Sequence, residues 1–388
     1  MGKMWRIGSE ELEYIKEAID QGLSGEFNKR FEEAFANKFG VNFAIGVNSG
    51  TSALHCALAA VGVGHGDEVI VPPLTFAAPA FAALYLGAVP VFADIDPETF
   101  TIDPKEVKRK VTKKTKAIIP VHLYGLPADM DPIIEVAREK GVKVIEDCAQ
   151  CYLGKYKGRL AGTMGDMAIF SFERSKHMTT GNGGVIITND ESLAEKARKI
   201  SILGYSTVSA KESSFKMSKD LIQNPNFERH VTIGYNYRLP EICAAMALAQ
   251  LEKLDMFVEK RQKIARLYNK VVEGCELLTP QKTPKGYVNS YWTYALKLDA
   301  SISYQTFRTT FLEEGGEKFY GAWRVVYLEP VFKSIKFEGK VQYKKGLCPI
   351  AEELQPRLIQ LKTNFGDMRY AKAQAMALKR TIERLKEN

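Results

Sequence analysis

The chain carries the stretch AIFSFERSKHMTTGNGGVII at residues 168–187. It begins and ends with short apolar runs, 168–170 and 185–187, which have the length and composition of buried strands. A polar connection that ends in glycines joins the two runs and contains Lys176. The stretch therefore predicts two strands, with a lysine held on the connection between them at the edge of a sheet.

Short apolar runs of the same kind recur through the first half of the chain and alternate with helical patterns. They lie at residues 43–47, 69–71, 89–92, 117–121 and 142–145. Such alternation predicts an α/β fold in which a largely parallel sheet is covered by helices on both faces. Sheets of this kind bind ligands beyond the carboxyl ends of their strands. We therefore expect the functional residues directly after these runs.

Residues 69–93 contain no charged side chain, and a run of that length could in principle cross a membrane. Prolines and glycines divide it, however, at Pro72, Pro73, Pro79, Gly87 and Pro90. This punctuation favours two strands with a turn and a small-residue helix between them. We interpret the run as buried core and expect no membrane as a partner.

The second half of the chain changes character. Residues 205–230 are polar and poorly periodic, which predicts a long loop. A helical pattern then runs from Glu241 to about Val272 and marks the passage to a second domain. A strand at 291–298 and a final helix at 367–386 follow. We expect a large domain over residues 1–255, whose N-terminal segment can pack on the small domain, and a smaller C-terminal α/β domain over 256–388.

The composition excludes some classes of protein. With 388 residues and 45% hydrophobic content, the chain can bury a large core. The formal charge of +8 suits nucleic acid, a membrane surface or an enzyme for anionic metabolites, and does not choose between them. The densest basic stretch, 105–116, follows a helix start at Asp103 and is interpreted as a solvated helix face. We expect no nucleic acid as a partner.

The cysteines and histidines indicate neither disulfides nor a metal. Six cysteines are scattered along the chain without a secretory leader, which favours reduced thiols and a cytoplasmic location. Cys148 and Cys151 form a Cys-x-x-Cys pair, but no second pair accompanies them. The five histidines lack zinc-type spacing. We therefore expect no metal site.

Two strand ends carry residues suited to an anionic ring ligand. The segment VNSGTSAL, residues 47–54, follows a strand and opens a helix, so its N–H groups can bind a phosphate; an ordinary Ser/Thr helix cap is the alternative. The run 142–145 leads into Glu146 and Asp147. An aspartate there can hold a pyridine nitrogen protonated, and a helix cap is again the alternative.

Lys176 stands out among the many basic residues because of its setting. A lysine in a partly desolvated pocket loses its proton readily and can attack an aldehyde carbon to form a Schiff base. Ser171, at the end of the preceding run, can bind the same phosphate as Thr51. A lysine, an aspartate and hydroxyl groups are thus expected at the same edge of the sheet.

These segments resemble a known family. The motifs are SGTSAL at 49–54, PLTF at 73–76, Glu146-Asp147, the stretch from Ser171 to Lys176, TGNGG within 179–184, and GYNYR at 234–238. In this order, over residues 25–254, they are similar to the DegT/DnrJ/EryC1/StrS family of sugar aminotransferases. The resemblance implies fold type I of the enzymes that depend on pyridoxal 5′-phosphate (PLP).

The resemblance also implies roles for individual residues. Lys176 would hold the cofactor as an imine and act as general acid and base, and pyridoxamine 5′-phosphate would be the intermediate form of the cofactor. Asp147 would pair with the pyridine nitrogen, and Gln150 would lie near the ring hydroxyl. The remaining cofactor-binding residues would be Phe76, stacked on the ring, and a phosphate group of Gly50, Thr51, Ser52 and Ser171.

Family members are homodimers that complete each site with an asparagine of the partner subunit, and Asn236 matches it. For Asn236 a plain turn residue is the alternative, and for Phe76 it is core packing. The family implies transfer of an amino group from L-glutamate or L-glutamine to a keto sugar, usually nucleotide-linked, in amino-sugar biosynthesis.

Two departures bear on the acceptor. Asn182 stands where many relatives have Glu, and residues 313–331 lack the Pro-x-His pattern of many sugar-nucleotide members. A keto-cyclitol or a free keto sugar is therefore an alternative acceptor. A PLP-dependent sugar dehydratase, in which His177 rather than Lys176 would be the base, and a non-catalytic binding protein are the other readings of the chain.

Overall fold

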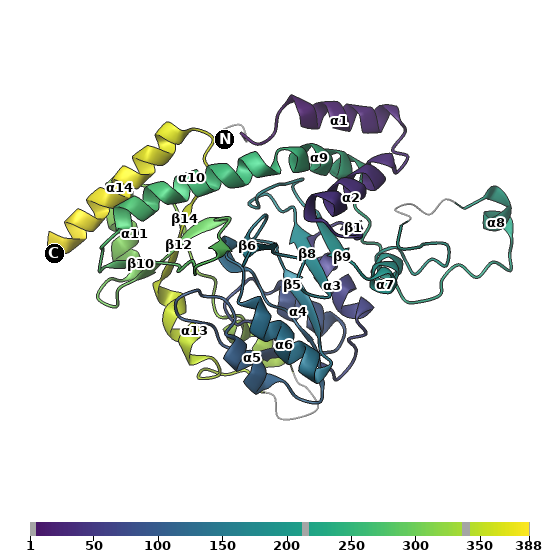
Figure 1. The fold of residues 1–388 in the computed structure, drawn as a ribbon, viewed down its shortest axis with the longest axis horizontal. Coiled ribbons are helices and arrows are strands. Elements are labelled where there is room, and N and C mark those ends of the chain that lie inside the picture. The colour runs from purple at the N-terminus through teal and green to yellow at the C-terminus, as the bar shows by residue number, and fades with distance from the viewer. Residues whose placement is uncertain (1–4, 212–216, 336–341, 388) are drawn as a thin grey trace.

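The computed structural model describes residues 5–211, 217–335 and 342–387, which form an α/β fold (Figure 1). Within these residues the large sheet has seven strands in the order β1-β9-β8-β5-β4-β2-β3. Their bounds are β1 Phe43–Val47, β2 Glu68–Val71, β3 Val89–Phe92, β4 Thr115–Ile118, β5 Lys143–Asp147, β8 Met167–Ser171 and β9 Gly184–Thr188. Every run expected to be a strand in the first half of the chain is one.

The directions of the strands bring three chain segments to one edge of this sheet. Strands β3, β2, β4, β5 and β8 are parallel, whereas β9 is antiparallel to both β8 and β1. Gly184 pairs with Val47 on one side and with Ser171 on the other, and Asp147 pairs with Ile169. The ends of β1, β5 and β8 and the connection 172–183 therefore lie together.

Helices cover both faces of the sheet because successive side chains of its strands point to opposite sides. Ile45, Ile169 and Ile186 pack with α3 and α7, while Ala44 and Phe170 pack with α2 and α9. The helices of this half are α1 Ser9–Asp20, α2 Glu26–Phe39, α3 Gly50–Ala60, α4 Ala78–Tyr85, α5 Pro104–Lys110, α6 Met130–Lys140, α7 Glu191–Ser201 and α9 Glu241–Glu252. The expected fold class is confirmed.

The C-terminal third builds a second sheet and core. Strands β10 Leu278–Pro280, β12 Thr293–Leu298, β14 Leu358–Lys362 and β13 Tyr320–Gly321 are antiparallel, in that order. They pack with α10 Leu254–Val272, α11 Tyr304–Glu313 and α14 Met368–Glu387 around Leu296 and Phe307. The short helices α12 Pro330–Ser334 and α13 Pro349–Leu354 pack instead against the core of the large sheet. A domain boundary at residue 255 stays a prediction.

A small third sheet ties the two parts together. Strand β6 Lys155–Tyr156 pairs with β7 Arg159–Leu160 and with β11 Tyr287–Val288. Because β11 precedes β12, this sheet fixes the start of β12 beside the large sheet.

Three elements differ from the expectation. Strand β4 ends at Ile118 instead of residue 121, because Pro120 has no N–H group to continue the ladder. The expected helix from Glu241 is two helices, which meet at Lys253. The expected loop 205–230 contains the short helix α8 Lys219–Gln223.

The segment around α8 projects from the body of the molecule (Figure 1). A bridge between Tyr205 and His230 closes its base. We call residues 205–211 and 217–230 the arm.

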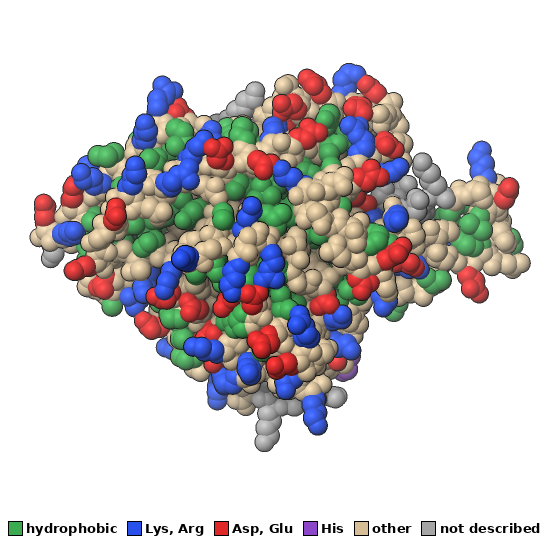
Figure 2. All heavy atoms as spheres, viewed as in Figure 1, with side chains coloured by type: hydrophobic (Ala, Val, Ile, Leu, Met, Phe, Trp, Pro, Cys, Tyr) green, Lys and Arg blue, Asp and Glu red, His purple; other side chains and the backbone are tan. Residues whose placement is uncertain are grey.

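Two surface properties concern possible partners. Basic and acidic side chains are interspersed over the face shown in Figure 2, so the net positive charge is not gathered there into one patch. None of the helices in the described ranges is long and apolar enough to span a bilayer.

Candidate active site

A cavity of about 470 Å³ lies at the edge of the large sheet where β1, β5 and β8 end. It is lined by Ser49, Gly50, Thr51, Leu54, Thr75, Phe76, Ala78, Pro79, Asp147, Ala149, Gln150, Ile169, Ser171, Glu173, Ser175, Lys176, Asn182, Gly183, Trp292 and Trp323. Most of the residues predicted from the sequence thus meet in one place.

Lys176 lies on the connection between β8 and β9, which turns back on itself. The Lys176 N–H donates to the Glu173 carbonyl at 3.0 Å. The Lys176 Nζ lies 4.4 Å from the centre of the Trp292 ring. Burial lowers the pKa of Lys176 to about 8, although the charge of Asp147 opposes this shift. At neutral pH the amine is therefore a much better nucleophile than that of an exposed lysine.

Strand β5 sends its last two carboxylates in opposite directions. Asp147 lines the cavity, and its Oδ1 accepts a hydrogen bond from the Ala149 N–H at 2.9 Å. Burial raises the pKa of Asp147, a shift that the Ala149 hydrogen bond and the charge of Lys176 oppose. A cationic group in the cavity would therefore be stabilised by pairing with this carboxylate.

The start of α3 forms the other end of the cavity. Ser49 caps the helix by accepting from the Ser52 N–H at 3.0 Å. A Cβ atom on Gly50 would lie 2.8 Å from the Ser171 Cβ, so only glycine allows this close approach of α3 to β8. The first N–H groups of a helix have no partner within it and carry partial positive charge. Together with Thr51 and Ser171, they make an anion site.

The Ser52 hydroxyl does not take part in this lining. It donates to Asn48 Oδ1 at 2.7 Å, and Ser52 is not among the residues around the cavity. The phosphate contact expected for Ser52 stays a prediction.

Phe76 and Gln150 border the cavity. Phe76 is 57% exposed and contacts Trp323 edge-on, with ring centres 5.7 Å apart, so it is not a core residue. Gln150 is buried, and its Oε1 accepts from the Tyr124 N–H at 2.9 Å. This bond fixes the side chain and leaves its amide nitrogen as the donor that a ring hydroxyl requires.

Asn236 lies outside the cavity of its own chain. It is exposed, and its Oδ1 accepts from Arg238 Nε at 3.0 Å. This position agrees with a contribution to a second subunit but does not test it.

His177 is turned away from the cavity. It is fully buried, its Nε2 lies 3.0 Å from the Ser290 carbonyl oxygen, and its ring packs on Tyr152. Burial holds the pKa of His177 well below its usual value. The His177 side chain does not enter the cavity that Lys176 lines, which argues against a dehydratase with His177 as the base.

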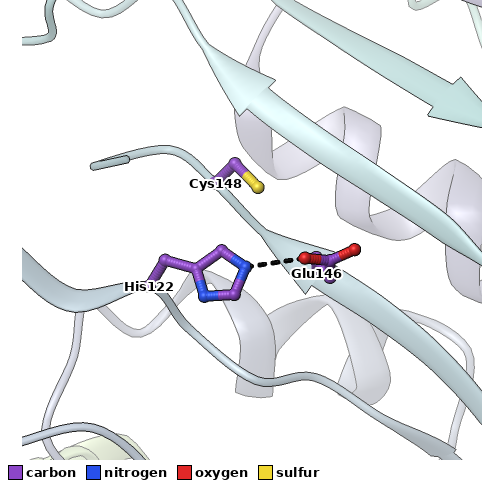
Figure 3. Close-up of side chains that lie close together, drawn as sticks. All are labelled: His122, Glu146 and Cys148. Carbon is purple, nitrogen blue, oxygen red and sulfur yellow. Dashed lines mark hydrogen bonds and ion pairs between the residues drawn. The ribbon is translucent and has the colours of Figure 1, made fainter. Parts of the chain in front are cut away.

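Within the described part of the chain, the structure brings together one set of metal-ligand residue types that spacing did not reveal: His122, Glu146 and Cys148, all buried (Figure 3). His122 Nδ1 accepts from the Ala128 N–H, so Nε2 carries the proton and donates to Glu146 at 2.9 Å. Both ring nitrogens are thus engaged. Burial raises the pKa of the Cys148 thiol well above its usual value.

The Glu146 carboxylate is equally occupied. It accepts from the N–H groups of Gly162, Met164 and Gly165 at 2.7–2.9 Å. Burial disfavours its charge, but these hydrogen bonds and His122 outweigh burial and lower the pKa of Glu146. The cluster holds the end of β5 in place beneath Asp147.

Sequence reasoning missed two aromatic residues of the cavity, Trp292 and Trp323. Their rings stack with centres 5.9 Å apart, and Trp292 donates from Nε1 to the Ser175 carbonyl. The only signal for Trp292 was its place near the start of the predicted strand 291–298, which begins at Thr293 in the structure. Asn182, noted above as a departure from the family pattern, and Trp323, which belongs to the stretch 313–331 noted with it, both line the cavity.

The comparison with known families decides between the readings. A family model described as the DegT/DnrJ/EryC1/StrS aminotransferase family matches residues 6–375. The chain belongs to this family. It is therefore a PLP-dependent aminotransferase, as the motifs around Lys176 predicted.

Individual proteins are similar to this chain in sequence or in structure. GDP-perosamine synthase of Escherichia coli O157:H7 is 36% identical over 358 residues, which are 92% of this chain and 90% of that protein. GDP-perosamine synthase of Caulobacter vibrioides is 41% identical over 310 residues, 77% of each protein. The solved structure of S. venezuelae DesV has a TM-score of 0.84 at 30% identity and covers 97% of this chain and 95% of that chain. An aminotransferase from Psychrobacter cryohalolentis has a TM-score of 0.86 at 27% identity, and 98% of each chain is covered.

Proposed function

We propose that this enzyme transfers an amino group from L-glutamate or L-glutamine to a keto sugar carried by a nucleoside diphosphate, with a GDP-linked sugar as the first candidate. One observation carries the proposal: a single cavity joins the amine of Lys176, the carboxylate of Asp147 and the start of α3.

The cavity residues fit PLP. Its phosphate would lie at Gly50, Thr51 and Ser171, where α3 and β8 approach closely. Its pyridine nitrogen would pair with Asp147. Burial raises the pKa of this carboxyl because it disfavours the charged form, and a positive partner would stabilise that form. The amide of Gln150 would reach the ring hydroxyl, and the exposed ring of Phe76 would cover one face of the pyridine ring.

When bound, PLP supplies an aldehyde for the lysine and an electron-withdrawing ring. The protein does the rest. Lys176 would hold the cofactor, and its amine, when free, would move a proton at the substrate carbon. Asp147 would keep the ring nitrogen protonated. Trp292 lies beside the amine and helps to exclude water from it.

The choice of acceptor rests on the relatives. Proteins named GDP-perosamine synthase match this chain at 34–41% identity in E. coli, C. vibrioides and Vibrio cholerae. The names favour a GDP-linked sugar over the keto-cyclitol or free keto sugar.

We include a homodimer in the proposal, with Asn236 entering the partner's cavity. The arm and the residues after it support a second copy as the partner, because they expose large apolar side chains. Ile222, Val231 and Ile233 are 48%, 56% and 83% exposed. Apolar exposure of this kind marks interaction surfaces. A cytoplasmic location is also proposed, and the six free thiols support it.

The test combines cofactor capture with a panel of acceptors. Purified protein is incubated with PLP, reduced with borohydride and digested, and we expect a pyridoxyl adduct on Lys176. The Lys176→Ala variant should stay colourless, whereas the exposed-lysine control Lys196→Ala should behave like wild type.

With L-glutamate as donor, release of 2-oxoglutarate is then measured for nucleotide-linked keto sugars, free keto sugars and keto-cyclitols. We expect a GDP-linked keto sugar to be favoured over the free sugar by about 100-fold or more in kcat/KM, because binding of the remote nucleotide contributes to catalysis. Equal turnover of the free sugar would contradict the proposed acceptor class. An adduct on another residue would contradict the proposed site.

A further inference from the structure

Two arginines lie buried behind the segment that carries Lys176. Arg6 belongs to the N-terminal segment ahead of α1, and Arg261 lies in α10. Only 2% of Arg6 and 1% of Arg261 is exposed. Neither residue lines the cavity.

Both guanidinium groups donate to backbone carbonyls of residues 174–177. Arg6 donates to Arg174 O at 2.7 Å, to His177 O at 2.8 Å and to Lys176 O. Arg261 donates to Ser175 O at 3.3 Å and to Lys176 O at 3.2 Å. Four successive carbonyls are thus held from remote parts of the chain, and that of Lys176 is held twice.

Arg261 also connects this segment to the second sheet. It donates to Trp292 O at 2.7 Å and to Thr363 Oγ1 at 3.1 Å. Trp292, whose ring lies under the lysine amine, is therefore fixed by the same guanidinium group as the lysine backbone.

Neither arginine forms a salt bridge with any residue in the described ranges, in contrast to the buried pair Arg198–Glu32. Burial lowers the pKa of Arg6 to about 10, and burial together with the charge of Arg6 lowers the pKa of Arg261 well below its usual value. Burying a cation without a carboxylate is costly. The arrangement needs a reason other than stability.

We propose that Arg6 and Arg261 are positioning residues for Lys176, which hold its backbone in place and, as fixed positive charges, favour the neutral form of its nitrogen. The inference rests on the proposed cofactor attachment at Lys176 and deepens it. A neutral amine is the form that attacks an aldehyde and accepts a proton.

The other charged groups around the amine work in the opposite direction. Burial and Arg261 lower the pKa of Lys176, whereas Asp147 and Glu173 raise it. If Asp147 pairs with the cofactor ring, its effect on the pKa of the amine weakens and that of Arg261 gains weight.

The test is a pH titration of the absorbance of the cofactor bound at Lys176, because this absorbance reports protonation of the linking nitrogen without turnover. We expect the midpoint in Arg261→Gln to rise by about one pH unit, since one positive charge has been removed. Arg6→Gln should raise it by less. Arg261→Lys keeps the charge, so its midpoint should stay near wild type, but kcat should fall about tenfold or more because lysine cannot span the four acceptors.

Arg198→Gln is the matched control, since it also removes a buried arginine, but one that donates to Glu32, Ala44 and Ala210 and not to residues 174–177. It should lose stability and keep the wild-type midpoint. If Arg261→Gln does not fold, Arg6→Gln carries the test of charge and Arg261→Lys the test of positioning.

The outcomes separate the inference from the function on which it rests. Wild-type protein that takes up no cofactor contradicts the proposed function. Folded Gln variants that bind the cofactor and titrate like wild type overturn the role of charge. A fully active Arg261→Lys overturns the role in positioning.

Discussion

Lys176 owes its chemistry to its surroundings and not to its type. Burial lowers its pKa to about 8, so about a tenth of the molecules carry a neutral amine at pH 7. An exposed lysine would be neutral in only about one molecule in 3,000 at that pH.

This difference predicts the pH dependence of cofactor capture. Because only the neutral amine reacts, the rate of PLP uptake by cofactor-free protein should rise tenfold per unit below about pH 8 and level off above it. Stopped-flow absorbance measures this rate. A rate that keeps rising to pH 10 would show that the amine has the pKa of an ordinary lysine.

Gly50 makes a second prediction possible for a single residue. A methyl group there would meet the Ser171 Cβ at 2.8 Å and push α3 away from β8. Gly50→Ala should therefore weaken PLP binding by about tenfold or more, equivalent to roughly 1.4 kcal/mol. Fluorescence titration with PLP measures the affinity. Gly64→Ala, where an added Cβ has nothing within 4 Å, is the control and should bind like wild type.

Lys176, Asp147, Thr51 and Ser171 could be predicted from the sequence because each follows a recognisable strand or opens a helix. Arg6 and Trp292 could not, since they reach the site through contacts between remote segments. Arg261 could have been noticed in the sequence, because it lies on the apolar stripe of α10 with Phe257, Ile264 and Tyr268. A charged residue on such a stripe indicates a buried role.

Among the elements, β5 shows how a strand can serve two purposes at its end. Asp147 faces the cavity, while Glu146 faces the backbone of residues 162–165 and His122. The contacts of Glu146 thereby fix the position of Asp147 at the cavity.

We therefore predict that Glu146→Gln lowers the free energy of unfolding by about 3 kcal/mol, because the amide nitrogen would face N–H donors that a carboxylate accepts. Urea denaturation followed by circular dichroism measures this. Glu139→Gln, at an exposed position of α6, should change stability by less than about 0.5 kcal/mol. A Glu146 variant as stable as this control would show that the cluster is dispensable.

The pattern of apolar runs predicted which segments are strands, but not their order. The reversal of β9 between β1 and β8 depends on side-chain packing across the whole sheet. The break between α9 and α10 at Lys253 also escaped prediction, because the apolar spacing continues across it.

At the scale of the whole molecule, the proposed sharing of sites between subunits can be tested by mixing. Lys176→Ala and Asn236→Ala subunits should each be poorly active alone. After unfolding and refolding together, mixed dimers would hold one site with both residues intact. Random pairing then predicts recovery of about a quarter of the wild-type activity.

The rate of 2-oxoglutarate formation before and after mixing measures this recovery. Sedimentation measures the number of subunits. A monomer, or mixtures no more active than their components, would contradict a site shared between subunits.

The hydrogen bonds of Arg6 and Arg261 to the backbone of Lys176 have a consequence for the order of events during synthesis. Trp5, beside Arg6, contacts Phe257 of α10 and donates to Asn364 Oδ1 at 3.0 Å. Residues 5 and 6 are thus fixed in part by residues that are synthesised much later. We expect a nascent chain that stops before α10 to contain the reactive lysine without the contacts of Arg261, so that the aldehyde is captured efficiently only after α10 has been synthesised.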